Sequence, residues 1–272
     1  MNRRLKRIAI AGVSAASLMG LFGFAGQSSA DTVVMGSTLS NNYDGAVSTS
    51  GMTVQLSYDP ATSPNPVISP ANGLITGWKV KSADDGALYT LKVLRPNAPV
   101  SLVTATNSNF KAITSVAAPA AVPAGTAGAS PTGAIFSYPA SLPISKGDYV
   151  GVRTGGAATG LPQSFTNGVP RNLIANNFAS QPADGNSADF LADEQHDLLL
   201  QATVQFCSVP VLKKLKTKPA KQALKAHDCL PKVKKSRTKK DKFKGKVLKQ
   251  KTPAGTTAPP GTVVPIVIGT KK

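Results

Sequence analysis

Carboxylate and amide side chains are concentrated in one stretch of this 272-residue sequence, residues 184–197. The residues in it that could act as ligands include Asp184, Asn186, Asp189, Asp193, Glu194, His196 and Asp197. Oxygen-rich loops of this kind can bind calcium. The stretch does not fit the EF-hand loop, because Ala188 occupies a ligand position and Asp189 stands where that loop requires glycine. We therefore expect a solvated loop before the last strand of its domain, with a calcium site as the alternative.

Three short patterns suggest catalysis, and each is incomplete. His196 next to Asp197 has the residue types of a base and its orienting acid, but adjacent residues seldom reach that geometry, and no Gly-x-Ser-x-Gly motif accompanies them. Ser108-x-x-Lys111 and Ser236-x-x-Lys239 match the first motif of penicillin-processing enzymes. Neither is followed by Ser-Asp-Asn or Lys-Thr-Gly. We predict no catalytic site, no cofactor and a protein that is not an enzyme.

The single tryptophan and the two cysteines have simpler interpretations. Trp78 is predicted to lie in a β core, with a sugar-stacking platform as the alternative. Cys207 and Cys229 flank a short predicted helix, which favours a disulfide over two buried thiols if the chain is exported. A zinc site would need more ligands than these cysteines and His227 supply. No metal is predicted.

Basic side chains follow the second cysteine in a dense run. Its members are Lys232, Lys234, Lys235, Arg237, Lys239, Lys240, Lys242, Lys244 and Lys246. Residues 207–272 carry 19 Lys/Arg and two Asp/Glu, whereas residues 31–206 carry eight and eleven. So much like charge destabilises a compact domain unless a polyanion offsets it. Nucleic acid is disfavoured as that partner, because Phe243 is the only aromatic residue in the stretch.

The elements that would position these residues fall into two groups. In residues 207–272, Pro219 suits the first turn of a helix that Thr217 caps. A strand is predicted over 245–250. A last strand is predicted from the alternation of Val264, Ile266 and Ile268 as its inward face, and Pro265 makes it an edge or bulged strand. Turn residues between these two strands predict a hairpin.

Residues 31–206 show short β patterns separated by turn residues. The predicted strands are Met52 to Leu56, Leu74 to Val80, Leu88 to Leu94, Ala134 to Tyr138, Tyr149 to Val152 and Leu198 to Val204. Asp84-Asp85-Gly86 predicts a hairpin between the second and third of these, and residues 117–133 a long loop. The whole chain is therefore expected to be mainly β, with an antiparallel, jelly-roll-like β-sandwich followed by a small α+β module.

The C-terminal stretch resembles the PASTA domain, a module appended to penicillin-binding proteins and bacterial serine/threonine kinases. The residues that carry the resemblance are Val209-Pro210, Leu212, Ala220, Leu224, Cys229, Gly245, Val247, Gln250, Gly255 and Gly261-Thr262-x-Val264-x-Ile266-x-Ile268. Lys214-Leu215 departs from a common Gly-Lys, and the proline after Gln250 comes one position late. The resemblance implies a strand, a helix and two or three further strands, with a role in recognising peptidoglycan.

The first thirty residues predict export. A basic start, Arg3-Arg4-Leu5-Lys6-Arg7, precedes an uncharged stretch and the small residues Ser28-Ser29-Ala30. We expect a cleaved signal peptide over 1–30, with an uncleaved anchor as the alternative, a β domain over 31–206 and a PASTA-like domain over 207–272. The predicted protein is secreted and wall-associated, has no stable membrane span after cleavage, and binds peptidoglycan or an anionic wall polymer through the basic run. The alternative function is a carbohydrate-binding or hydrolytic β domain that the tail localises.

Overall fold

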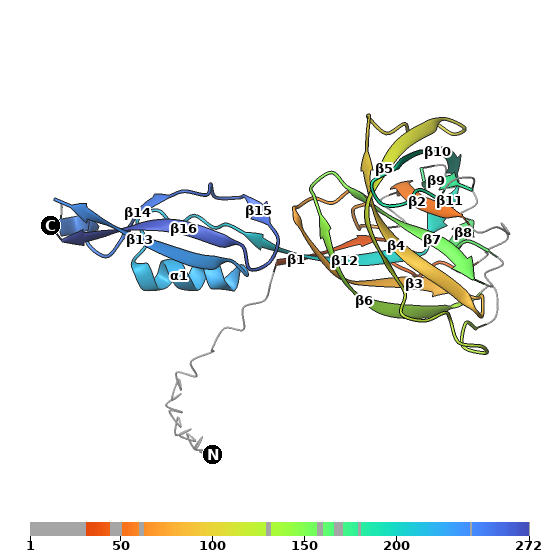
Figure 1. The fold of residues 1–272 in the computed structure, drawn as a ribbon, viewed down its shortest axis with the longest axis horizontal. Helices are drawn as coiled ribbons and strands as arrows, with labels where there is room; N and C mark the ends of the chain where they lie inside the picture. Colours follow the sequence, from red (N-terminus) through yellow and green to blue (C-terminus); the bar gives the residue numbers. More distant parts are fainter. Residues whose placement is uncertain are drawn as a thin grey trace, which may run out of the picture.

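The computed structural model describes residues 31–43, 51–59, 63–128, 132–156, 160–165, 171–178, 181–239 and 241–271. The predicted signal peptide, residues 1–30, lies outside the described residues. A larger N-terminal domain and a smaller C-terminal domain lie end to end and are joined by strand β12 (Figure 1). No described helix is long and apolar enough to span a membrane.

The N-terminal domain consists of an open sheet beside a closed barrel, with every strand pair antiparallel. The open sheet has the order β1 (Asp31–Gly36), β12 (Leu200–Ser208), β3 (Gly73–Ser82) and β6 (Ala134–Ile144). The barrel has the order β10 (Ser187–Glu194), β5 (Asn107–Ala117), β4 (Ala87–Pro96), β7 (Tyr149–Gly156), β2 (Met52–Ser57) and β9 (Leu173–Asn177). β8 (Gln163–Phe165) and β11 (His196–Leu198) form a separate small pair.

Two large hydrophobic cores result from the alternation of side chains along these strands. Trp78 and Val80 of the open sheet pack with Tyr89 and Val152 on the outer wall of the barrel. A second core fills the barrel and includes Met52, Phe110 and Phe190. Phe110 and Phe190 meet edge to face with ring centroids 5.4 Å apart.

The mainly β, antiparallel character of this domain is confirmed, whereas the jelly-roll-like sandwich is not. Six strands close into a barrel and the other sheet packs on its wall. A strand with one buried face has the same period-2 pattern in a sandwich and in a barrel, so the sequence does not distinguish the two.

Five of the six predicted strands fall within observed strands, and the sixth, Leu198 to Val204, runs from the end of β11 across Leu199 into β12. The predicted hairpin at Asp84-Asp85-Gly86 is wrong. A turn is present, and Gly86 has the positive φ of 76° that it requires. β3 nevertheless pairs with β6 and β12, and β4 pairs with β5 and β7. The turn therefore carries the chain from the open sheet to the barrel wall. The Asp85 carboxylate accepts backbone N–H groups of Gly125 and Ala127 in the loop that packs beside it.

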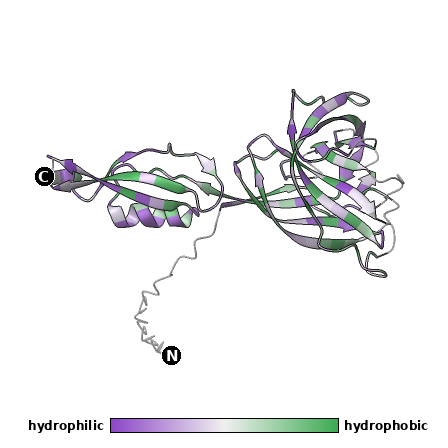
Figure 2. Ribbon diagram, viewed as in Figure 1, coloured by the Kyte–Doolittle hydropathy of each residue, from purple (hydrophilic) through white to green (hydrophobic). Residues whose placement is uncertain are grey.

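The C-terminal domain is a three-stranded sheet covered on one face by a helix. Its elements are α1 (Thr217–Ala226), β13 (Leu230–Thr238), the 3-10 turn η1 (Asp241–Phe243), β14 (Val247–Gln250), β15 (Thr257–Ala258) and β16 (Val263–Lys271). The sheet order is β13-β16-β14, with β13 parallel and β14 antiparallel to β16. The residues of β16 are mostly hydrophobic, whereas those of α1 are mostly hydrophilic (Figure 2).

Two local predictions in this domain are corrected. β16 is the central strand, not an edge strand; Pro265 is tolerated because β14 pairs only as far as Ile266, and its carbonyl still accepts the Lys251 N–H. Thr217 is the first helical residue and does not cap the helix: its hydroxyl donates to the Gly245 carbonyl. Thr217 thereby ties the start of α1 to the segment before β14.

Candidate functional site

The basic run lies on the frame that β16 provides. Val264, Ile266 and Ile268 of this strand are buried with Ala220 and Leu224 of α1, so one face of the sheet belongs to the core. The opposite side chains of β16 lie on the face away from the helix, which we call the open face. Along β16 the open face presents Val263, Pro265 and Val267.

Lysines border this apolar row on both sides. On β13, Lys232 is opposite Pro265 and Lys234 is opposite Val267, and both lysines are exposed. On β14, exposed Lys249 is also opposite Val267. Neighbouring strands lie about 4.8 Å apart, so the lysine Cα atoms flank β16 at about 10 Å from one another. The open face therefore combines an apolar centre with ammonium groups along each edge.

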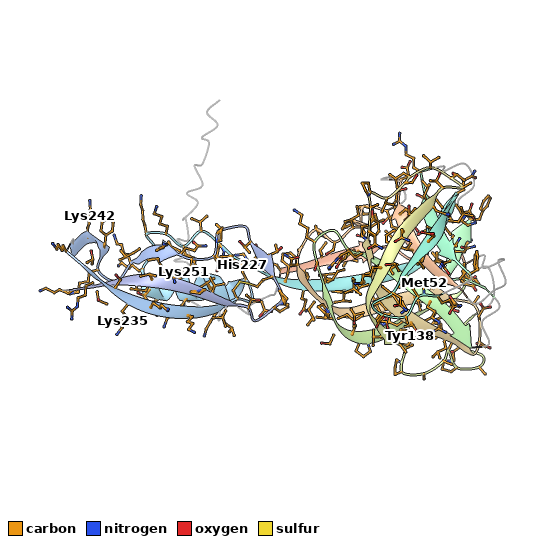
Figure 3. The ribbon with its side chains drawn as sticks, turned by 45° about the horizontal axis from the view of Figure 1, so that its top comes forward. Met52, Tyr138, His227, Lys235, Lys242 and Lys251 are labelled. Atoms are coloured by element: carbon orange, nitrogen blue, oxygen red, sulfur yellow. A yellow bond between two sulfur atoms is a disulfide. The ribbon has the colours of Figure 1, made fainter. Side chains whose placement is uncertain are left out.

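Most of the remaining members of the predicted basic run lie elsewhere, although Lys244 is opposite Gly269, two residues beyond Val267 on β16. Lys235 and Arg237 point to the helix side of β13, since Lys235 is opposite the core residue Ile268. The turn after β13 carries Lys239, Lys242, Lys244 and Lys246, and Lys240 lies outside the described residues. Lys235 and Lys242 lie at the end of the domain farthest from the barrel (Figure 3). A continuous sequence run is thus divided between two faces and a tip.

The lysine and arginine side chains of this domain lack acidic partners within the part of the chain that the structure describes. The ion pairs found there involve Lys92, Arg95, His196 and His227, and none of the lysines after residue 207. Lys242 has one favourable contact, with its Nζ 5.4 Å from the Phe243 ring centroid. The positive charge of the domain is therefore uncompensated, and it attracts polyanions over a range that salt screening limits.

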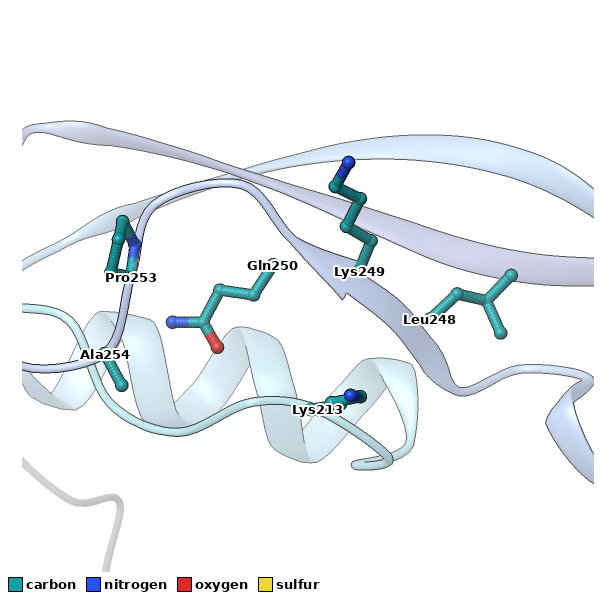
Figure 4. Close-up of a pocket in the computed structure, with 6 residues that line it drawn as sticks. All are labelled: Lys213, Leu248, Lys249, Gln250, Pro253 and Ala254. Atoms are coloured by element: carbon teal, nitrogen blue, oxygen red, sulfur yellow. The ribbon is translucent and has the colours of Figure 1, made fainter.

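A shallow depression beside β14 is lined by two lysines that are not part of the predicted basic run. It has a volume of about 260 Å³ and is lined by Lys213, Leu248, Lys249, Gln250, Pro253 and Ala254 (Figure 4). Gln250 is held in place, because its Oε1 accepts the Leu212 N–H at 3.0 Å and its Nε2 donates to the Pro210 carbonyl at 2.9 Å. Lys249 lies beyond the end of the basic run, and only the pairing of β14 with β16 brings it into the site.

The predicted disulfide is present between Cys207 and Cys229. Cys207 is the last residue but one of β12, the strand shared by the two domains, and Cys229 follows α1, so the bond fastens the helix to β12. His227 is not arranged as a metal ligand with these sulfurs: its Nδ1 lies 2.9 Å from Asp31 Oδ2 at the start of β1.

The acidic stretch predicted as a loop is largely strand β10, and its carboxylates are dispersed. Asp184 pairs with Lys92 at 3.0 Å, and Asp189 accepts a hydrogen bond from Asn109 at 2.6 Å. Asp193 lies 3.5 Å from His196, while Asn186 closes a turn through its backbone; of the Glu194 side chain nothing is described. No group of three His, Cys, Asp or Glu side chains among the described residues could hold a metal ion.

Asp197 lies apart from the other acids in a buried polar pocket. Its Oδ2 accepts hydrogen bonds from Ser37 at 3.1 Å and Asn41 at 2.7 Å. Burial raises the pKa of Asp197 to about 6, even though hydrogen bonds and the nearby Lys81 ammonium lower it. His196 does not orient toward this carboxylate as a base would, because it pairs with Asp193.

The remaining candidates occupy structural positions. Trp78 is 2% exposed and packs on Tyr138 with ring centroids 4.7 Å apart, as the core prediction expected. Ser108 is buried on β5 and accepts the Ser101 N–H. Residues three apart on a strand face opposite sides, so Ser108 does not share a face with Lys111. Ser236 and Lys239 are exposed at the end of β13.

Comparison with known proteins adds one assignment. A family model of the PASTA domain matches residues 208–270, so the C-terminal domain is a PASTA domain and indicates a function related to the cell wall. No curated protein and no solved structure matches the chain.

Proposed function

We propose that this chain is an exported, non-enzymatic protein of the cell envelope that binds peptidoglycan or an anionic wall polymer through its PASTA domain and presents the N-terminal domain there. The matched family supports the wall as the target. The basic start of residues 1–30 and the paired cysteines support export.

The observation that carries the proposal is the open face. Lys234 and Lys249 flank Val267 on paired strands, so two lysine side chains extend from the sheet with an apolar row between them. Backbone pairing fixes the spacing of their Cα atoms, which lowers part of the entropy cost of arranging the two cations around a ligand. Wall polymers carry phosphates or carboxylates along a chain, which suits two rows of cations better than a single closed pocket.

A sedimentation assay with purified peptidoglycan sacculi tests the proposal. The protein lacking residues 1–30 is mixed with sacculi that retain their anionic polymers and with sacculi stripped of them, at low and high salt. We expect binding at low salt that falls as salt rises. Protein that stays in the supernatant with both preparations at low salt contradicts the proposed function.

A charge-matched pair of variants tests the location. Lys232→Gln, Lys234→Gln and Lys249→Gln together remove three charges from the open face, and Lys218→Gln, Lys221→Gln and Lys225→Gln remove three exposed charges from α1. At about 0.5 kcal/mol for each exposed ion pair, the first variant should bind about tenfold more weakly. The helix variant should stay close to the parent. Equal losses in both variants would assign binding to overall charge and not to the open face.

A further inference from the structure

A second surface depression lies on the outer wall of the barrel in the N-terminal domain. It has a volume of about 260 Å³ and is lined by Thr104, Ala105, Asn176, Phe178, Leu191, Ala192 and Asp193. It lies on the part of the barrel wall that the open sheet no longer covers. Ile174 on β9 faces outward and is fully buried in the core between sheet and barrel, whereas Asn176, two residues further along the same face, is only half-buried.

An aromatic ring forms one side of this depression. Phe178 follows β9 and keeps 46% of its surface exposed, and Leu191 on the adjacent strand β10 is 50% exposed. The ring rests on Gly51, where an added Cβ would lie 2.7 Å from Phe178 Cδ1. One side of the phenyl group therefore lies close against the Gly51 backbone, and the other side stays accessible.

Two polar side chains on the same wall are available to a ligand. Asn176 Oδ1 accepts the Thr53 hydroxyl at 2.6 Å, so its amide is oriented and its Nδ2 has no hydrogen-bond partner among the described residues. The Asp193 side chain is 52% exposed, with Oδ2 3.5 Å from His196 Nδ1. The register places Asn176 directly opposite Leu191, and Asp193 lies two residues along on the same face.

We propose that this depression binds a sugar ring of a neutral hexose or N-acetylhexosamine glycan. Phe178 and Leu191 contact the apolar C–H face of the ring, Asp193 accepts hydrogen bonds from ring hydroxyls, and the Asn176 amide donates one. Pockets that combine a rigid aromatic surface with a few oriented polar groups are typical of small-ligand sites.

Charge decides between neutral and anionic sugars. Residues 31–206 carry eight Lys/Arg and eleven Asp/Glu, and the acid in the depression is Asp193. A negatively charged sugar would meet repulsion there, whereas the PASTA domain attracts it. The two domains therefore address different ligands, and this site does not depend on the function proposed for the open face.

A screen of immobilised neutral and N-acetylated oligosaccharides, followed by calorimetric titration of the best binder, tests the proposal with the protein lacking residues 1–30. Binding should be nearly unchanged by high salt. Phe178→Ala should weaken it by about tenfold, because the aromatic contact supplies much of the buried area. Asp193→Asn should also weaken it, while Ile135→Ala, which removes a similarly exposed apolar side chain from β6, should leave it unchanged.

Three outcomes would overturn the assignment. The first is the absence of binding to every neutral glycan tested, and the second is binding that survives both Phe178→Ala and Asp193→Asn. The third is self-association that Phe178→Ala abolishes while no glycan binds, which would make the depression a protein-docking surface. The salt-resistant signal separates this result from failure of the wall-polymer proposal, whose signal is lost at high salt.

Discussion

Among the described carboxylates, Asp197 is the one whose pKa burial raises, and this makes stability depend on pH near neutrality. The side chain is 2% exposed, and burial raises its pKa from 3.8 to about 6. The folded state therefore binds a proton more tightly than the unfolded state does. Its contribution to stability is complete below about pH 4 and is lost as pH rises through 6, a difference of about 3 kcal/mol.

Asp197→Asn should remove this penalty. An Asn oxygen at the position of Oδ2 still accepts the Ser37 and Asn41 hydrogen bonds, and the amide carries no charge. We expect the free energy of unfolding at pH 7.5 to rise by up to about 3 kcal/mol, measured by urea denaturation. The parent protein should gain stability between pH 7.5 and 5, and the variant should not. A less stable variant at pH 7.5 would contradict this account.

The sequence predicts which residues carry charge more reliably than it predicts which residues lie next to them in space. The basic run was identified in full, yet strand alternation sends Lys234 and Lys235 to opposite faces. Lys249 joins the open face through its pairing with Val267, a contact between strands that no local pattern encodes. The buried pocket of Asp197 likewise joins residues about 160 positions apart, Ser37 among them.

At the scale of elements, strand β10 was missed although its signal was present. Ala188, Phe190 and Ala192 alternate with Asp189 and Asp193, and they belong to or pack against the barrel core. The number of acids led to the prediction of a solvated loop. A period-2 pattern outweighs polar composition when one face of the strand is buried.

The turn at Asp85-Gly86 shows a different limit. Turn chemistry specifies a local reversal but not whether the flanking strands pair with each other. Here β3 and β4 enter different sheets, because Val80 and Leu91 both belong to the core between them. The fold of the PASTA domain could be predicted better, since the spacing of its residues matches a known module over its whole length.

The disulfide is the element-scale feature with the most direct consequence for stability. Cys207 and Cys229 close a loop with a sequence separation of 22, which in the chain-entropy model contributes about 3 kcal/mol. Replacing both cysteines with alanine should lower the stability of the PASTA domain by about that amount in denaturant titrations. The barrel domain should unfold as before. Equal stability of the parent and the double variant would contradict this expectation.

The whole molecule depends on one strand that serves both domains. Val204 of β12 is buried in the N-terminal core, and Cys207, three residues on, is buried in the PASTA core and pairs with Ala258. Further contacts brace this junction. Asn72 donates from its backbone N–H to Thr257 Oγ1 at 3.1 Å and from its Nδ2 to the Thr257 carbonyl at 3.3 Å.

These contacts predict that the two domains tumble as one elongated body. Nuclear magnetic relaxation of the protein lacking residues 1–30 should fit a single anisotropic diffusion tensor for both domains. Asn72→Ala with His227→Ala removes the side-chain bonds to the Thr257 carbonyl and to Asp31, each contributing about 1 kcal/mol, and leaves β12 and the bond from the residue 72 backbone N–H to Thr257 Oγ1 as the connection. The diffusion tensors fitted separately to the two domains should then differ.

Thr262→Ala, which removes a hydrogen bond to Pro259 within the PASTA domain, should leave tumbling unchanged. Separate tensors in the parent protein would show that β12 bends, and the open face would then lie at no fixed position relative to the barrel.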